Sequence, residues 1–216
     1  LIMWGSNVPL TRTPDAHWMT EARYRGQKVV VMSPDYAENV KFADEWLPVA
    51  PGTDAALGMA MGHVVLKEFF VDKEVDYFTH YNRHYTDLPF LIALEQQPDG
   101  TWKPGKNLVA GDFEGPQQDS ENAMFKPAMW DRVTNAPAIP NGTLGHRFGD
   151  EGMGKWNLEL GDLDPALTLY GEDAETVELV LTRFDTPDDQ VAAIHRGVPV
   201  RRVGDRVVTT VFDLLL

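Results

Sequence analysis

The fold is decided by residues 1–32, LIMWGSNVPLTRTPDAHWMTEARYRGQKVVVM. Leu1–Trp4 is a short apolar run that predicts a strand, and Lys28–Met32 contains three successive valines, which favour a buried parallel strand. Between the two runs, Gly5–Asp15 is rich in glycine, asparagine, proline and threonine, the residues that turns and helix starts use. The stretch therefore predicts a strand, a loop with a connecting element, and a second parallel strand.

The connecting element is expected to be a helix. Pro14 and Asp15 suit a helix start, and the run from His17 to Tyr24 is followed by Gly26, which suits an end. A strand, a helix and a parallel strand in this order make one βαβ unit.

The pattern continues beyond the second strand. Asp35 is followed three residues later by Glu38, which resembles a capping box and predicts a short helix through Ala43. A third strand is expected over Glu45–Val49. The longest helix is expected over Thr53–Phe70, where many apolar residues predict packing on the sheet.

The character of the sequence changes after about residue 96. Asp72–Tyr85 is expected to be helical and Pro89–Gln96 a strand, whereas 97–216 holds much of the glycine and proline and only short apolar runs. Hairpin-type signals stand at Asp99-Gly100, Asn141-Gly142 and Gly204-Asp205, the last within the alternating run Arg201–Phe212. The sequence therefore predicts an α/β protein: a Rossmann-like parallel sheet with flanking helices over 1–96, and an irregular, β-rich appended segment over 97–216.

Composition excludes several functions. The 33 acidic and 19 basic side chains give a formal net charge of −14, which repels phosphate backbones, so nucleic acid is not an expected partner. There is no cysteine, which excludes disulfides, thiolate nucleophiles and cysteine ligation of iron–sulfur clusters by these residues. No apolar run approaches the roughly 20 residues that span a bilayer. The abrupt apolar ends, Leu1–Trp4 and Leu214–Leu216, are expected to be cuts from a longer chain.

The first candidate binding loop holds Gly5, Ser6 and Asn7, where the first strand feeds the helix. In doubly wound sheets this position binds dinucleotide phosphates, because glycine lets the backbone approach closely and the helix start offers free N–H groups. The loop lacks the GxGxxG pattern, which disfavours a nicotinamide site. An ordinary tight turn is the alternative.

Two further loops follow predicted strands. Ser33 and Asp35 stand roughly where such folds place an acidic residue on a ribose hydroxyl, and the alternative is a helix-capping carboxylate. Gly52 and Asp54 open the long helix, and the two oxygens of Asp54 are spaced to accept paired N–H groups from a base such as guanine. The alternative for Asp54 is a favourable charge in the first helical turn. All three loops are expected at the carboxyl edge of the sheet, where open sheets bind ligands.

Metal ligation finds little support. Only His80 and His84 stand at i, i+4 spacing, with no acidic third ligand placed by the sequence.

At these loops the chain resembles the alpha subunit of membrane-bound respiratory nitrate reductases, within the molybdopterin guanine dinucleotide enzymes related to dimethyl sulfoxide reductase. Four stretches carry the match: WGSNVPLTRTPDAH at 4–17, Val31–Pro34 with Asp35-Tyr36-Ala37, Phe42–His63 with PGTDAALGMAMGH, and Tyr77–Pro89 with RHYTDLP. PNGTLG at 140–145 and GKWNL at 154–158 follow further along the chain. The match is weakest over 112–132 and 164–188.

The resemblance implies a cofactor and residues for it. The cofactor is molybdenum bis(molybdopterin guanine dinucleotide), and the loops would hold one of its two guanine dinucleotide arms. Gly5, Ser6 and Asn7 would line the phosphate and pterin side. Ser33 and Asp35 would meet the guanosine, and Gly52 and Asp54 the guanine edge. No catalytic residue and no metal ligand is expected within the chain.

The resemblance also implies a parent enzyme that reduces nitrate to nitrite in anaerobic respiration. Its electrons would arrive through an iron–sulfur beta subunit from a quinol-oxidising membrane gamma subunit, in a complex at the cytoplasmic face. The cluster ligands and the aspartate that coordinates molybdenum precede the tryptophan-glycine-serine-asparagine loop in that family. The isolated chain is therefore expected to be inactive.

Three alternatives stay open at this point. One is a nitrite oxidoreductase alpha subunit, which has the same fold and catalyses the reverse reaction, the oxidation of nitrite to nitrate. A non-catalytic module would bind a guanine nucleotide without molybdenum, and a purely structural interaction domain would bind neither.

Overall fold

The computed structural model describes residues 1–115, 118, 122–141, 158–171, 174–182 and 191–216. The chain divides into two compact units, Leu1–Val64 and Val65–Leu216, so the division falls within one long helix. No helix in the described part of the chain is long and apolar enough to span a bilayer. The hairpin signal expected at Asn141-Gly142 extends outside the described residues.

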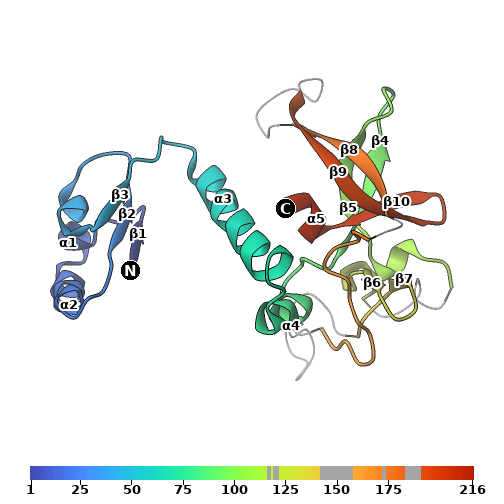
Figure 1. Cartoon of the computed structure of the whole chain (residues 1–216), viewed down its shortest axis with the longest axis horizontal. Helices are drawn as coiled ribbons and strands as arrows, with labels where there is room; N and C mark the ends of the chain where they lie inside the picture. The colour runs from blue at the N-terminus through green and yellow to red at the C-terminus, as the bar shows by residue number, and fades with distance from the viewer. Residues whose placement is uncertain (116–117, 119–121, 142–157, 172–173, 183–190) are drawn as a thin grey trace. The chain divides into compact units, whose positions relative to one another are not determined.

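The first unit contains the predicted parallel sheet (Figure 1). Its strands lie in the order β1 (Ile2–Trp4), β2 (Val30–Met32) and β3 (Glu45–Leu47), and both neighbouring pairs are parallel. The core beneath the sheet consists of Met3, Met19, Val29, Val31 and Val40. The valine run therefore forms the buried central strand, as its β-branching predicted.

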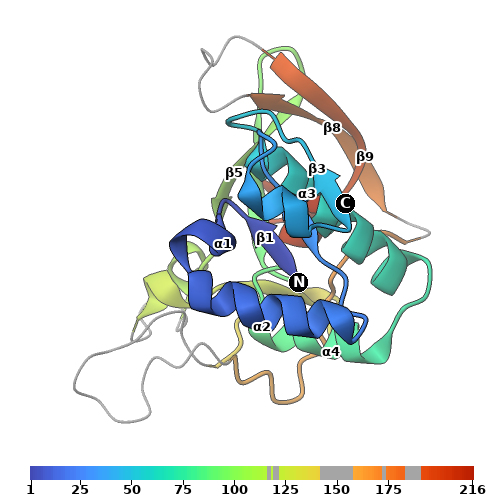
Figure 2. The same ribbon diagram turned by 90° about the vertical axis from the view of Figure 1, so that its left-hand side faces the viewer.

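The helices around this sheet match the expectation in part. α2 (Thr13–Tyr24) is the predicted connection between β1 and β2, and it packs on the sheet through Met19. A short helix that the sequence did not predict, α1 (Val8–Thr11), lies within the expected loop, and both helices lie beside β1 in Figure 2. Pro9 in the first turn favours this additional helix, because its missing N–H is not needed there.

The predicted capping box at Asp35 and Glu38 is wrong. The element that follows β2 is a 3-10 helix, η1 (Glu38–Phe42), and its N-cap residue is Ala37, which makes no side-chain cap. Asp35 instead accepts a hydrogen bond from the hydroxyl of Ser33 at 2.9 Å, and this local turn competes with capping.

The predicted long helix exists as α3 (Asp54–Leu66), continued by a π-helical turn, η2 (Lys67–Val71). Its expected packing on the sheet is wrong, since no side chain from Asp54 to Val65 is buried. The apolar residues of α3 surround the helix instead of forming one stripe, so they specify no single packing face.

The second unit begins with the end of α3, followed by η2 and α4 (Asp76–Tyr85). It contains a closed five-stranded β-barrel, whose strands lie in the order β10-β4-β5-β8-β9 (Figure 1). The barrel strands are β4 (Leu91–Gln96), β5 (Trp102–Asn107), β8 (Glu175–Thr182), β9 (Val191–Val203) and β10 (Arg206–Thr210), and α5 (Val211–Leu215) ends the chain. The expected hairpins at Asp99-Gly100 and Gly204-Asp205 are confirmed, as the links between β4 and β5 and between β9 and β10. The β-rich segment is thus more regular than the sequence predicted.

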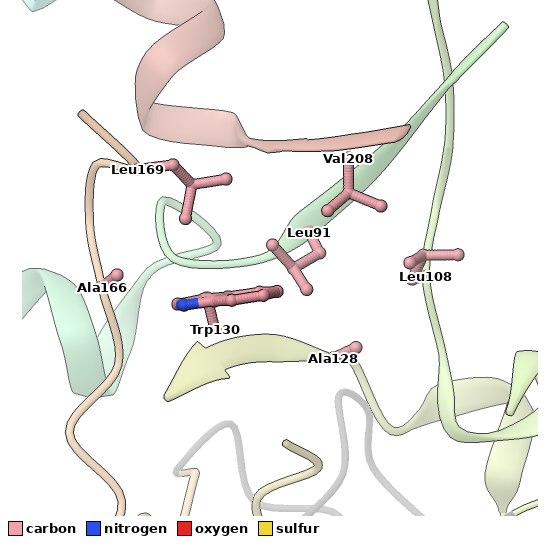
Figure 3. Close-up of a cluster of buried hydrophobic side chains, with 7 residues drawn as sticks. All are labelled: Leu91, Leu108, Ala128, Trp130, Ala166, Leu169 and Val208. Atoms are coloured by element: carbon pink, nitrogen blue, oxygen red, sulfur yellow. The ribbon is translucent and has the colours of Figure 1, made fainter. Parts of the chain in front are cut away.

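Shorter elements surround the barrel. They are the hairpin β6 (Met129–Asp131) and β7 (Ala136–Ala138), and the 3-10 helices η3 (Ala110–Asp112) and η4 (Ala123–Phe125). One core of this unit, drawn in Figure 3, gathers side chains from distant segments: Leu91, Leu108, Ala128, Trp130, Ala166, Leu169 and Val208. Leu91 and Leu169 lie on one side of the Trp130 ring, so this core joins the barrel to the loops beside it.

The assignment of 1–96 to cofactor binding and 97–216 to an appended segment stays a prediction. The compact units divide earlier in the chain, because β4 pairs with β5 and β10 and so belongs to the barrel.

Candidate cofactor-binding site

The three predicted loops leave one edge of the sheet in the first unit. Trp4 lies opposite Met32, and Met32 lies opposite Leu47, so the carboxyl ends of β1, β2 and β3 are level. Parallel strands point in one direction, and the segments that follow them therefore start at the same edge. Gly5, Ser33 and the Gly52 turn all follow that edge, as the βαβ pattern predicted.

The first loop is held in a turn by its backbone. Gly5 has a φ of +64°, in the left-handed region that favours glycine. The carbonyl of Asn7 accepts hydrogen bonds from the N–H of Leu10 at 3.1 Å and of Thr11 at 2.9 Å, which starts α1. The amide nitrogen of Asn7 donates to Glu38 at 3.4 Å. Its buried amide oxygen has no partner among the described residues.

The second loop is held by the side chain of Ser33, which is buried. Its hydroxyl donates to the carboxylate of Asp35 at 2.9 Å, and the indole N–H of Trp46 donates to its carbonyl at 2.9 Å. Asp35 itself is exposed. Its carboxylate therefore stands at the sheet edge, oriented by a serine that the core fixes.

The third loop connects to the first through a side chain. Gly52 has a φ of +82°, and the hydroxyl of Thr53 donates to the carbonyl of Ala50 at 2.7 Å. Asp54, in the first turn of α3, accepts a hydrogen bond at 2.6 Å from the indole N–H of Trp4. The expected guanine-binding carboxylate is thus already engaged by the last residue of β1.

Two site residues were missed by sequence reasoning. Asn39 is only 4% exposed, donates from its amide to the carbonyl of Ser6 at 3.4 Å, and keeps a buried amide oxygen without a described partner. Glu38 accepts from Asn7. A backbone hydrogen bond and the bond from Asn7 lower the pKa of Glu38, so it is ionised at neutral pH. Asn39 stands between the charged Glu38 and the apolar Val40, so the local sequence carries no signal that its side chain is buried.

The chemistry of the edge favours a ligand rich in hydrogen-bond donors. Asp35 and Asp54 offer carboxylate oxygens, and Asn7 and Asn39 offer buried amide oxygens that need donors. Guanine, ribose and a reduced pterin all carry N–H or O–H groups, so these residues fit such a cofactor. Phosphates would instead meet backbone N–H groups and the hydroxyl of Ser6.

Metal ligation is not favoured by the geometry. Within the described ranges, no group of three histidine, cysteine, aspartate or glutamate side chains could hold a metal ion. His80 and His84 on α4 stack on each other at 4.2 Å between ring centroids.

Comparison with known proteins gives matches along the chain. A family model described as molybdopterin oxidoreductase matches residues 1–194. The nitrate reductase alpha subunit of Mycobacterium tuberculosis is 58% identical over 221 residues, which cover 100% of this chain and 18% of that protein. The nitrate reductase alpha chain of Bacillus subtilis is 43% identical, and the respiratory nitrate reductase 1 alpha chain of Escherichia coli 41% identical, with the same coverage of each chain. The chain therefore spans about 18% of the length of these relatives.

Proposed function

Because this chain belongs to the molybdopterin oxidoreductase family, we propose that it forms part of a molybdenum-containing catalytic subunit that reduces nitrate to nitrite. Its own contribution is to bind one guanine dinucleotide arm of the cofactor at the carboxyl edge of the β1-β2-β3 sheet. The observation that carries this proposal is the convergence of three loops at that edge, with carboxylates and unpartnered amide oxygens that suit a donor-rich ligand.

Each loop has a defined part in the proposal. The backbone of Gly5, with Ser6 and Asn7, lines the phosphate and pterin side. Ser33 orients Asp35 toward the ribose, and Gly52 brings Asp54 to the guanine edge. Seven residues thus hold the arm: Gly5, Ser6, Asn7, Ser33, Asp35, Gly52 and Asp54.

When bound, the molybdenum cofactor supplies the two-electron exchange with nitrate. The residues of this chain bind and orient the end of the cofactor that is remote from the metal. A rigid anchor of this kind reduces the freedom of the reacting end, because a fixed arm leaves fewer positions for the group attached to it.

We also propose the assembly that the resemblance implies, since the relatives are named as alpha subunits or alpha chains. An iron–sulfur cluster with ligands outside these residues would pass electrons from an iron–sulfur beta subunit. A quinol-oxidising gamma subunit would attach the complex to the cytoplasmic face of a membrane. The absence of cysteine from this chain is consistent with cluster ligands elsewhere in the subunit.

The binding role is tested by Asp54→Asn in the full-length subunit. Asparagine keeps the size of the side chain but replaces one acceptor oxygen with a donor, which opposes the N–H groups of guanine. Hydrogen bonds to a charged group are worth about 1.5–3 kcal/mol, so the retained guanine nucleotide and molybdenum should fall about tenfold or more. Both are measured on the purified protein by nucleotide chromatography and elemental analysis.

Asp15→Asn is the matched control, because Asp15 also stands in the first turn of a helix of the same unit and is exposed. Asp15→Asn should retain the full cofactor content. Full cofactor content in both variants would mean that Asp54 only stabilises a helix start. That result would contradict the proposed binding role.

The reaction is tested on the same full-length subunit with reduced viologen as electron donor. Nitrate should be consumed with formation of an equal amount of nitrite. With an oxidised electron acceptor in place of reduced viologen, oxidation of nitrite as the faster direction would favour the nitrite oxidoreductase alternative. Guanine nucleotide without molybdenum in the purified protein would instead favour a non-catalytic binding module.

A further inference from the structure

We infer that Trp4 is a positioning residue for the cofactor: its indole N–H fixes the carboxylate of Asp54 in the orientation that receives the guanine edge. The inference rests on the function proposed above. It adds to the seven expected binding residues a side chain that acts through one of them.

The contact is short and joins distant parts of the sequence. The nitrogen Nε1 of Trp4 lies 2.6 Å from Oδ1 of Asp54, 50 positions along the chain. The same ring also contacts α3 one turn further on, where its atom Cη2 would stand 3.7 Å from a β-carbon at Gly58. The indole of the last β1 residue therefore lies along the first turns of α3 and connects the first loop to the third.

The backbone that carries the donor is held more firmly than the backbone that carries the acceptor. Trp4 pairs with Met32 in the sheet, next to the fully buried Met3 and Val31, so its backbone is held on the core. Asp54 is exposed, at the start of a helix that has no buried side chain over Asp54–Val65. An exposed aspartate samples several rotamers, and a charge-assisted hydrogen bond from an indole that also lies against α3 at Gly58 restricts it to one.

The bond leaves Asp54 able to bind the base. An indole has one N–H and no acceptor, so Trp4 occupies a single lone pair of Oδ1. A carboxylate offers about four lone-pair positions on two oxygens. Oδ1 and Oδ2 can therefore still accept the ring and exocyclic N–H groups of guanine side by side.

A competing interpretation predicts the opposite effect on cofactor retention. If Trp4 occupied the position that the base needs, the indole would have to leave before the cofactor binds. Removing the N–H would then raise the retention of cofactor, whereas a positioning role predicts that retention falls.

The test uses the full-length subunit and Trp4→Phe, which removes the N–H and keeps an aromatic ring against α3. We expect the guanine nucleotide and molybdenum content to fall about fivefold. This factor corresponds to a loss of about 1 kcal/mol of binding free energy when the Asp54 carboxylate is no longer held in one orientation. Trp18→Phe is the matched control, because Trp18 belongs to the same unit, is 71% exposed and contacts His17 rather than a candidate loop. It should retain the full content.

The double variant separates positioning from structural stability. If Trp4 acts through Asp54, Trp4→Phe combined with Asp54→Asn should lose no more cofactor than Asp54→Asn alone. Additive losses would mean that Trp4 only stabilises the fold, which would overturn the inference. Trp4→Tyr provides a second variant, since its hydroxyl can donate to Asp54, and it should retain more cofactor than Trp4→Phe.

The outcomes distinguish this inference from the proposed function. Full cofactor content in Asp54→Asn overturns the proposed binding role itself. Loss in Asp54→Asn with full or increased content in Trp4→Phe overturns the positioning role alone. If Trp4→Phe and Trp4→Tyr both failed to fold, as judged by circular dichroism, Trp4 would be a residue that the fold requires. That result would also overturn the positioning role.

Discussion

Asp131 shows how much one buried carboxylate can organise in the second unit. It is 2% exposed and accepts hydrogen bonds from the backbone of Val133, from the backbone and hydroxyl of Thr134, and from the backbone of Asp164. Burial raises the pKa of Asp131, but these hydrogen bonds outweigh burial and lower the pKa from 3.8 to about 2. The charged form is therefore the form that the fold stabilises.

A pH dependence of stability follows from this pKa. Because the folded pKa lies below the unfolded value, Asp131 contributes stability above about pH 4 and loses it as the pH falls toward 2. The shift corresponds to about 2 kcal/mol of unfolding free energy. Asp131→Asn should remove this part of the acid sensitivity, as measured by urea unfolding followed by tryptophan fluorescence between about pH 5 and pH 2.

Asp205→Asn is the control for that experiment, since Asp205 is exposed in the turn between β9 and β10. It should keep the acid sensitivity of the unchanged chain. If Asp131→Asn lost stability with pH as steeply as the control does, the hydrogen bonds to Asp131 would not favour its charged form.

Single residues also mark the limit of the sequence analysis at the site. The positions of Gly5, Ser33 and Gly52 at one sheet edge could be predicted, because parallel strands place their carboxyl ends together. The hydrogen bond from Trp4 to Asp54 could not be predicted, because it depends on rotamers and on the path of the chain over 50 positions. The binding roles of the seven loop residues stay predictions.

Glycine substitutions in two elements, β5 and α3, are expected to change the stability of the fold in opposite directions. At Gly105 in β5, an added β-carbon would stand 2.6 Å from the carbonyl oxygen of Ala93 in β4, next to an irregularity in the pairing of these strands. Gly105→Ala should therefore displace the barrel strands and cost about 1–3 kcal/mol. At Gly62 in α3 an added β-carbon meets nothing within 4 Å, so Gly62→Ala should stabilise the helix by up to about 1 kcal/mol.

Thermal unfolding monitored by circular dichroism measures both changes on the same chain. A stable Gly105→Ala protein, with a melting temperature at or above that of the unchanged chain, would mean that β4 and β5 separate easily at this point. A destabilised Gly62→Ala protein would mean that α3 has a close neighbour at Gly62 in solution.

Elements dominated by local signals were predictable, and elements that depend on distant pairing were not. The helix over Thr13–Tyr24 follows from Pro14 in its first turn and Gly26 after its end, and the strand at Val30–Met32 follows from β-branching. The barrel closes because β4 pairs with β10, more than 100 positions later. Periodicity within a window identifies such strands but not their partners.

At the scale of the whole molecule, the residues that the structure describes offer no group of side chains suited to hold a metal ion. The chain also has no cysteine. We therefore predict that the isolated chain, purified alone, contains no stoichiometric molybdenum or iron and does not reduce nitrate. Elemental analysis checks this, with the full-length subunit as positive control, and stoichiometric metal in the isolated chain would show that its ligands lie within these residues.

The central claim, that the carboxyl edge of the β1-β2-β3 sheet holds a guanine dinucleotide arm, is tested most directly by an experimental density map of the full-length subunit with its cofactor. We expect the guanine N–H groups to lie about 3 Å from the Asp54 carboxylate, with the ribose beside Asp35. We also expect the Trp4 indole to donate to Asp54 in that map. A guanine ring bound elsewhere, with these three loops covered by other parts of the subunit, would contradict the claim.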